Sequence, residues 1–272
     1  MAQGPHRFRT RTIDPGVRLQ RRPLPGWPLL LMVLASVQAC TVGTEGTPST
    51  EGSANDTPGD KADNGTEEGL PKGIRWVRDA AEYRAASIQT YRLAALRLEQ
   101  IVEEENYAPD TWGVSLDADE TTLSNLQYEI ESYEPNPTSF PAWVRRQEAT
   151  AMPGVVAFTQ KVHELGGYVA IVTNRSKSFC ADTEDNLTKQ GVPFDIVLCK
   201  TGSSQKESRW KMLEDGTTPD GLPPIELVMW IGDNIQDFPY VTQNIHSKPE
   251  SDYGAFGERF FVIPNPMYGS WD

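Results

Sequence analysis

Hydrophobic side chains in residues 75–105 recur at steps of three and four positions. This spacing places them on one face of an α-helix. An aromatic stripe at helical spacing is typical of a packing face, so we predict one long helix that covers a core. The stripe consists of Trp76, Ala80, Tyr83, Ser87, Tyr91, Ala94, Leu98 and Ile101.

Beyond this helix, short apolar runs alternate with helix-like segments. The runs at 112–116, 167–172, 194–198, 227–231 and 259–263 are predicted strands, and 155–165, 179–190 and 204–214 are predicted helices. Continuous apolar strands separated by helices indicate an α/β fold with a doubly wound parallel sheet that is covered on both faces. Residues 124–150 interrupt the pattern with aromatic residues and prolines, and we expect them to form a small helical cap.

The N-terminal segment has the layout of an export signal. Residues 1–28 are rich in Arg and precede a short apolar run at 29–37. A helix that spans a bilayer needs about 20 apolar residues, so this run is too short to be one. A basic segment, an apolar run and then small residues are typical of a signal peptide, which we assign to residues 1–39.

Cys40 follows this segment directly. A small residue before a lone cysteine at this place resembles a bacterial lipoprotein signal, which implies acylation of Cys40 and cleavage before it. An ordinary secretory signal with a chance cysteine is the alternative. We expect an exported protein that a lipid anchor holds at the bacterial cell envelope, in the outer membrane.

Residues 40–73 are predicted to be an acylated cysteine and a flexible tether. The segment is rich in Gly, Thr, Ser, Pro and acidic residues and nearly empty of large apolar ones. Such a composition buries too little apolar surface to offset the entropy that ordering would cost. The folded domain is therefore assigned to residues 74–272.

Charge and cysteine content exclude several classes of protein. The chain has 25 Lys and Arg against 38 Asp and Glu, a formal net charge of −13, so binding of duplex nucleic acid is not expected. It has three cysteines and no CxxC pair, which excludes a zinc finger and a disulfide-rich miniprotein.

Cys180 and Cys199 fall near the carboxyl ends of neighbouring predicted strands. They could pair in an exported protein or stay free thiols.

Polar residues follow successive predicted strands, where a doubly wound sheet binds its ligands. Each motif alone is weak, but all of them in this order form a strong joint signal. The residues are Asp117, Asp119, Thr173, Asn174, Lys206, Asp233 and Asp237.

Two carboxylates placed two positions apart can take different roles in phosphoryl transfer. Asp117 can attack phosphorus as a nucleophile. Asp119 can protonate the leaving oxygen and later deprotonate the hydrolytic water. Asp117 and Asp233, with the backbone carbonyl of Asp119, offer the hard oxygen ligands that Mg²⁺ prefers. The cation is needed because a carboxylate must approach an anionic phosphate in an acidic protein.

The remaining motif residues suit the phosphoryl oxygens. Thr173, the backbone of Asn174 and Lys206 are candidate donors to them, although the lysines at 200 and 211 compete for the last role. Asp237 is placed to orient a metal-bound water or Lys206, and a simple helix cap is the alternative.

The motifs together resemble the haloacid dehalogenase superfamily and, within it, the class C acid phosphatases, which include outer-membrane lipoprotein 5′-nucleotidases. The resemblance covers residues 74–272. It rests on LDADETTLSN at 116–125, VTNR at 172–175, the segment 206–209, GDNIQDF at 232–238 and PNPMYGSW at 264–271.

The resemblance implies a Mg²⁺-dependent phosphomonoesterase that forms a phospho-aspartate. Asp117 becomes the nucleophile, Asp119 the acid/base and Asp233 a metal ligand, with Thr173, Asn174 and Lys206 binding phosphate. Phe140 and Tyr268 match the rings that stack on the base in nucleotidases, which implies a nucleoside monophosphate as substrate. A phosphatase of sugar phosphates and a non-catalytic surface lipoprotein are the alternatives.

Overall fold

A computed structural model describes residues 69–272. The predicted signal peptide, Cys40 and most of the predicted tether lie outside the described residues. The first helix, α1 (Lys72–Asp79), begins at Lys72, so the last two residues assigned to that tether are helical. Within residues 69–272, the structure contains no helix with both the length and the apolar character needed to cross a membrane.

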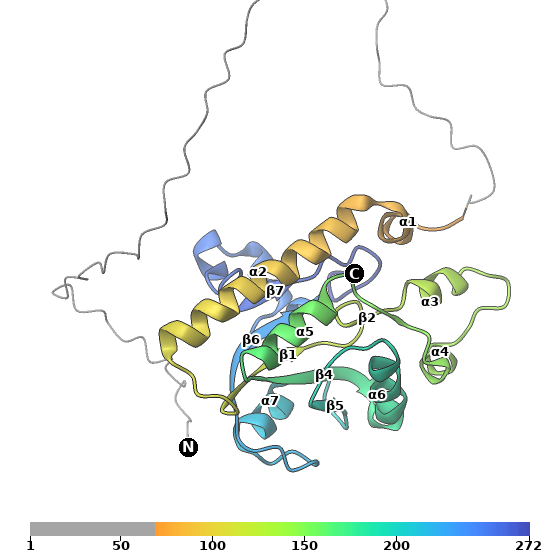
Figure 1. Ribbon diagram of the computed structural model, residues 1–272. Coiled ribbons are helices and arrows are strands. Elements are labelled where there is room, and N and C mark those ends of the chain that lie inside the picture. Colours follow the sequence, from red (N-terminus) through yellow and green to blue (C-terminus); the bar gives the residue numbers. More distant parts are fainter. Residues whose placement is uncertain (1–68) are drawn as a thin grey trace, which may run out of the picture. The chain divides into compact units, whose positions relative to one another are not determined.

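Five parallel strands form the central sheet (Figure 1). They are β1 (Trp112–Leu116), β4 (Tyr168–Ser176), β5 (Ile196–Lys200), β6 (Glu226–Gly232) and β7 (Phe260–Val262). Their order is β5-β4-β1-β6-β7, so β1 lies at the centre with β4 and β6 on either side. The predicted α/β class with a parallel sheet is confirmed. Since β4 runs past its predicted end at residue 172, Thr173 and Asn174 lie within the strand rather than after it.

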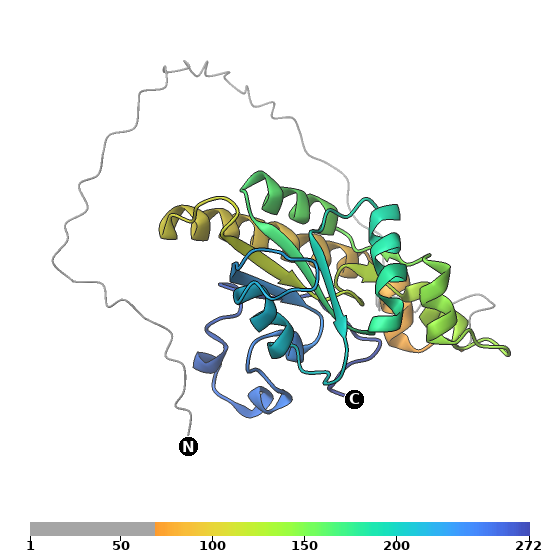
Figure 2. The ribbon, with the colours of Figure 1, turned by 90° about the horizontal axis from the view of Figure 1, so that it is seen from below.

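Helices cover both faces of this sheet (Figure 2). One face packs against α2 (Ala81–Glu105), α5 (Val155–Glu164) and α6 (Cys180–Lys189), which follows the short 3-10 helix η1 (Lys177–Phe179). The other face packs against α7 (Glu207–Glu214) and a long segment with three 3-10 helices: η2 (Ile235–Asp237), η3 (Gln243–Ser247) and η4 (Glu250–Tyr253).

Side chains of β4 alternate between the two cores. Val169 and Ile171 are buried on the α2 side, while Ala170 and Val172 are buried with Trp210 of α7. Both faces of a strand are apolar when both faces of the sheet are covered, which explains the continuous apolar runs in the sequence.

The prediction of one long helix over residues 75–105 is wrong. Ala80 has extended backbone angles, φ −82° and ψ 124°, and separates α1 from α2. The buried residues of α1 are Ile74 and Val77. Neither belongs to the predicted stripe, which is buried only in α2. Gly73 also lies so close to the C-terminal tail that an added Cβ would stand 2.2 Å from the carbonyl oxygen of Pro266. Tertiary packing of α1 therefore overrides the local helical pattern.

The predicted cap is confirmed and contains two short helices, α3 (Leu126–Glu131) and α4 (Phe140–Arg146). An antiparallel pair of two-residue strands, β2 (Leu123–Ser124) and β3 (Thr150–Ala151), closes its base. The cap begins shortly after Asp119, so it grows directly out of the loop that follows the central strand.

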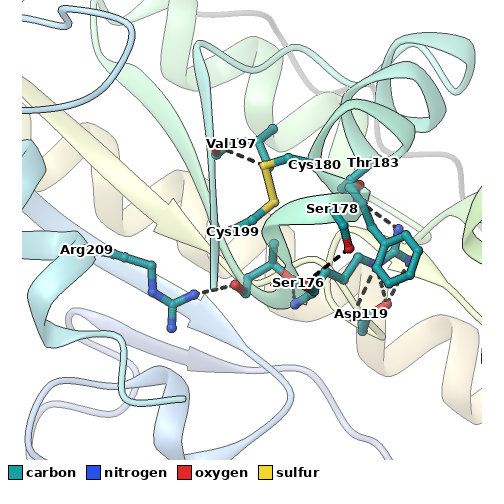
Figure 3. The surroundings of a disulfide bond; sticks show 11 residues. Asp119, Ser176, Ser178, Cys180, Thr183, Val197, Cys199 and Arg209 are labelled. Carbon is teal, nitrogen blue, oxygen red and sulfur yellow. Dashed lines mark hydrogen bonds and ion pairs between the residues drawn. A yellow bond between two sulfur atoms is a disulfide. The ribbon is translucent and has the colours of Figure 1, made fainter. Parts of the chain in front are cut away.

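Cys180 and Cys199 form a disulfide, which settles the question that the sequence leaves open (Figure 3). It joins the first residue of α6 to β5. The N-terminal end of α6 is thereby fixed to the sheet next to the carboxyl end of β4.

Candidate active site

The ends of β1 and β6 bring two predicted residues together. Asp117 follows β1, and its backbone N–H donates to the carbonyl oxygen of Ile231 at 3.0 Å. Asp233 follows β6. The carboxylates of Asp117, Asp233 and Asp237 each provide an oxygen, and these oxygens all lie within 4.8 Å of one another. The parallel register of β1 and β6 explains this convergence, because the carboxyl ends of parallel strands meet at one edge of the sheet.

Lys206 is the cation that faces these carboxylates. It precedes α7 and is 2% exposed. Its Nζ contacts Oδ1 of Asp117 and lies 2.7 Å from Oδ1 of Asp237. Lys211, a competing candidate in the sequence, is largely exposed and pairs with Asp215 instead.

Asp237 serves both purposes considered for it. Its Oδ1 pairs with Lys206, while its Oδ2 accepts the backbone N–H of Asn234 at 2.9 Å and so caps η2. Gly232 makes this position possible, since a Cβ there would stand 2.2 Å from Cβ of Asp237.

Asp233 is held by two donors from distant parts of the chain. The hydroxyl of Thr121 donates to Oδ1 at 3.0 Å, and the side-chain amide of Asn265 donates to Oδ2 at 2.8 Å. Asn265 belongs to the C-terminal tail, which explains why this tail is part of the site. Its contact with Asp233 was not predicted from the sequence.

The electrostatics of this cluster fit a divalent cation. Burial raises the pKa of Asp117 to about 7, against the opposing effect of Lys206, and the neighbouring Asp237 raises it further. Burial and the charges of Asp237 and Asp117 raise the pKa of Asp233 well above its ordinary value. Two buried carboxylates and one half-buried carboxylate with one lysine beside them are short of positive charge, and their hard oxygens are suitable ligands for a divalent metal.

Thr173 and Asn174 lie beside this cluster on β4 and share one partner. The guanidinium of Arg209 donates to the backbone oxygen of Thr173, and at 2.7 Å to Oδ1 of Asn174. It also donates to the backbone oxygen of Ser204 at 3.3 Å. Arg209 therefore fastens the loop that carries Lys206 to β4. The only sign of this role in the sequence is the place of Arg209 in the segment 206–209.

The side chain of Asp119 lies apart from the three clustered carboxylates. It forms an ion pair with Arg175 of β4 at 2.8 Å and accepts from the side-chain amide of Asn125 at 2.7 Å. The prediction gave Asp119 only a backbone contact to the metal, so its side chain is available for another role. Sequence reasoning did not assign Arg175 a role, although it is part of the VTNR motif.

Glu120 is a second acid that the sequence did not single out. It is buried, its backbone has a φ of 52°, and this left-handed conformation is uncommon outside glycine. Its carboxylate accepts the backbone N–H of Asn125 at 2.6 Å and the hydroxyl of Tyr268. These bonds hold the loop after β1 in a conformation that Glu120 would otherwise avoid.

The two predicted stacking rings reach the same group of polar side chains. Tyr268 binds Glu120 through its hydroxyl. The ring of Phe140 lies 5.2 Å from that of Tyr128 and 5.8 Å from the guanidinium of Arg175. Stacking of a base by these rings stays a prediction.

Comparison with known proteins places this site in a family. Residues 62–271 match the model of the HAD superfamily, subfamily IIIB (acid phosphatase). The fold is similar to the class C acid phosphatase from Bacillus anthracis, with a TM-score of 0.65 and 25% identity over 73% of this chain and 84% of that one. A structure of that phosphatase with tungstate bound gives a TM-score of 0.64, again with 25% identity over 73% and 84% of the two chains. The chain is therefore a phosphomonoesterase, and it belongs to the acid phosphatases of HAD subfamily IIIB.

Proposed function

We propose that the enzyme is Mg²⁺-dependent and transfers the phosphoryl group of its substrate to Asp117. One observation carries the proposal: the buried carboxylate of Asp117 ends the central strand, touches Lys206 and lies beside Asp233 and Asp237. A nucleophile needs such a fixed position, and a phosphate needs positive charge nearby.

The side chains of Asp117 and Asp233 would hold the cation, with the backbone carbonyl of Asp119 as a third ligand. Asp237 lies behind them as the partner of Lys206. Bound Mg²⁺ would supply positive charge that neutralises the phosphoryl oxygens and lets a carboxylate approach them.

The protein groups then carry two steps. An oxygen of Asp117 forms a bond to phosphorus as the ester P–O bond breaks, and Asp119 gives its proton to the leaving oxygen. Water next attacks the phospho-aspartate, Asp119 takes a proton from it, and phosphate leaves with Asp117 restored. The hydroxyl of Thr173, the backbone N–H of Asn174 and the Lys206 ammonium bind the phosphoryl oxygens.

The proposed substrate is a nucleoside monophosphate. Its base would stack between Phe140 and Tyr268, and stacking on an aromatic ring is worth about 1–3 kcal/mol. The support is that both rings contact the polar side chains around Asp119. A sugar phosphate is the alternative, because the phosphoryl site alone does not require a base.

Hydrolysis of p-nitrophenyl phosphate with Mg²⁺ and with EDTA tests the chemistry. We expect EDTA to abolish turnover and added Mg²⁺ to restore it. Asp117→Asn should abolish turnover while the protein stays folded by circular dichroism, and Asp110→Asn, at an exposed loop position, is the matched control. Turnover in EDTA, or a wild-type rate in Asp117→Asn, would reject the proposal.

Comparison of AMP with glucose 6-phosphate tests the substrate. We expect a higher kcat/KM for AMP, and the Phe140→Ala variant should lose this preference by about 5- to 150-fold, the loss that one stacked ring predicts. Equal kcat/KM values for both substrates in the wild type would argue for a general phosphatase of small organic phosphates.

We also propose that the enzyme is exported and anchored by a lipid on Cys40. The support is the order of basic, apolar and small residues before that cysteine. Expression of the full chain and of Cys40→Ser, with labelled fatty acid and membrane fractionation, tests this. Label and membrane association should both disappear in the variant, and an unlabelled wild-type protein would contradict the proposal.

A further inference from the structure

The carboxylate of Asp119 is bound very unequally at its two oxygens. Oδ1 accepts from Nη2 of Arg175 at 2.8 Å, from Nε of Arg175 at 3.0 Å and from Nδ2 of Asn125 at 2.7 Å. Oδ2 has one long contact of 3.3 Å, to Nε of Arg175. The side chain is 22% exposed, and Oδ2 is the oxygen with the fewer donors.

Arg175 is itself held on several sides. It is 3% exposed, and its Nη1 donates to the hydroxyl of Thr183 in α6 at 3.2 Å. The disulfide between Cys180 and Cys199 ties the start of α6 to β5, and Figure 3 shows Thr183 beside this disulfide, with Asp119 farther away. The planar guanidinium therefore has a fixed orientation, and so has the carboxylate that it binds.

Asn125 connects the same carboxylate to the cap. Its side-chain amide donates to Asp119 and, at 2.9 Å, to Glu120. Its carbonyl oxygen accepts from the indole N–H of Trp143 in α4 at 2.8 Å. The guanidinium of Arg175 also lies 5.8 Å from the ring of Phe140 in the same helix. Both residues that donate to Oδ1, Asn125 and Arg175, thus lie against side chains of the cap helix α4.

We propose that Arg175 is the positioning residue of Asp119: it occupies Oδ1 so that Oδ2 points its proton at the leaving oxygen. This inference rests on the proposed role of Asp119 as acid/base. In the step, the proton on Oδ2 passes to the leaving oxygen while the ester P–O bond breaks, and Asp119 is left as a carboxylate paired with Arg175. Misplacement of a reacting group by about 1 Å can cost about 100-fold in rate.

Two aryl esters with different leaving groups separate positioning from general damage. Phenyl phosphate has a poor leaving group, which needs the proton from Asp119 to depart. The p-nitrophenolate of p-nitrophenyl phosphate departs with little help from a proton. kcat/KM includes only the steps up to departure of the leaving group, so it is the quantity to compare. We expect Arg175→Met to lower kcat/KM by about 100-fold for phenyl phosphate and by less than about 10-fold for p-nitrophenyl phosphate.

Further variants keep the test clear. Arg175→Lys retains the charge without the planar fork and should show a smaller loss with the same selectivity. Arg97→Met, at an arginine on α2 that pairs with Glu104 and Glu258, is the control and should behave as wild type. The double variant Asp119→Asn with Arg175→Met should be no slower than Asp119→Asn alone, because both changes remove the same proton transfer.

Equal losses on the two esters, or losses that multiply in the double variant, would overturn the proposal. Thermal unfolding of each variant identifies any that fail to fold, and Arg175→Lys then carries the comparison. A selective loss supports the role of Arg175 whichever group attacks phosphorus. An active Asp117→Asn variant counts against the proposed phospho-aspartate instead, so the two failures are distinguishable.

Discussion

Gly232 is the residue that leaves space for Asp237 behind the carboxylate cluster. A methyl group at this position would displace Asp237, and Lys206 would lose one of its two carboxylate partners. We expect Gly232→Ala to lower kcat/KM at least about 10-fold and to destabilise the fold by about 1–3 kcal/mol. Enzyme assays and urea unfolding measure the two effects.

Gly202→Ala is the matched control, because an added Cβ there meets no atom within 4 Å. It should change neither quantity. Wild-type activity in Gly232→Ala would show that the position of Asp237 does not matter for Lys206 or for turnover.

Glu120 makes the stability of the fold depend on pH. Burial raises its pKa from 4.5 to about 8, against hydrogen bonds from Tyr268 and Asn125. Between these values the folded protein holds a proton that the unfolded chain has released. The stabilisation of the fold by this proton is therefore complete below pH 4.5, and it is lost as the pH rises through about 8.

Thermal unfolding in EDTA from pH 4.5 to 8 tests this expectation. The melting temperature should fall toward pH 8, and Asp117, whose pKa burial raises to about 7, contributes in the same direction. Glu120→Gln removes one titrating group and should make the fall shallower. An unchanged slope in the variant would show that Glu120 does not take up a proton on folding.

Residues at strand ends could be placed from the sequence, and their side-chain partners could not. Asp117 and Asp233 were predicted to converge because the carboxyl ends of parallel strands meet at one edge of the sheet. The pairs formed by Arg175 with Asp119 and by Tyr268 with Glu120 join positions that are 56 and 148 residues apart. No local pattern in the sequence specifies such pairs, since the first depends on how β4 lies beside the loop after β1 and the second on how the tail folds back.

At the scale of elements, the disulfide fixes α6 to the sheet. Cys180 and Cys199 are 19 residues apart, and a crosslink that closes a loop of this size contributes about 3 kcal/mol by restricting the unfolded chain. We expect the double variant Cys180→Ala with Cys199→Ala to lower the free energy of unfolding by about this amount in urea. Reductant should destabilise the wild type and leave the double variant unchanged.

An equal response of both proteins to reductant would mean that the bond does not form in solution. The two alanines remove both thiols, so neither free cysteine can complicate the comparison.

Strands were easier to predict than helix boundaries. The run at 112–116 matches β1 residue for residue, because five consecutive buried residues leave little freedom in placing it. The break at Ala80 was missed because no proline or glycine marks it, and it arises from contacts of α1 with the distant tail. The predicted helix at 204–214 likewise begins only at Glu207. Lys206 and its loop lie outside the helix, because Lys206 forms ion pairs with the clustered carboxylates.

At the scale of the whole molecule, the sequence predicts the sheet, the cap and their place around one site. These follow from the alternation of apolar runs and polar strand ends over residues 112–272. Asp237 was predicted to orient a metal-bound water or Lys206, and its position beside Asp117 and Asp233 depends on the turn that follows Gly232.

The carboxylate cluster links metal binding to stability of the whole domain. Three acids held within 4.8 Å of one another repel, and a cation that binds only the folded protein relieves this repulsion. We expect Mg²⁺ to raise the melting temperature at pH 7. Asp233→Asn should abolish the rise, and an equal rise in that variant would place the metal elsewhere.

The central claim is that the phosphoryl group passes through Asp117. Its most direct test is acid quenching of the enzyme during turnover of a ³²P-labelled phosphomonoester, followed by peptide mapping. We expect label on the peptide that contains Asp117 in the wild type and none in Asp117→Asn. A wild-type enzyme that turns over under the same conditions without any labelled peptide would contradict it.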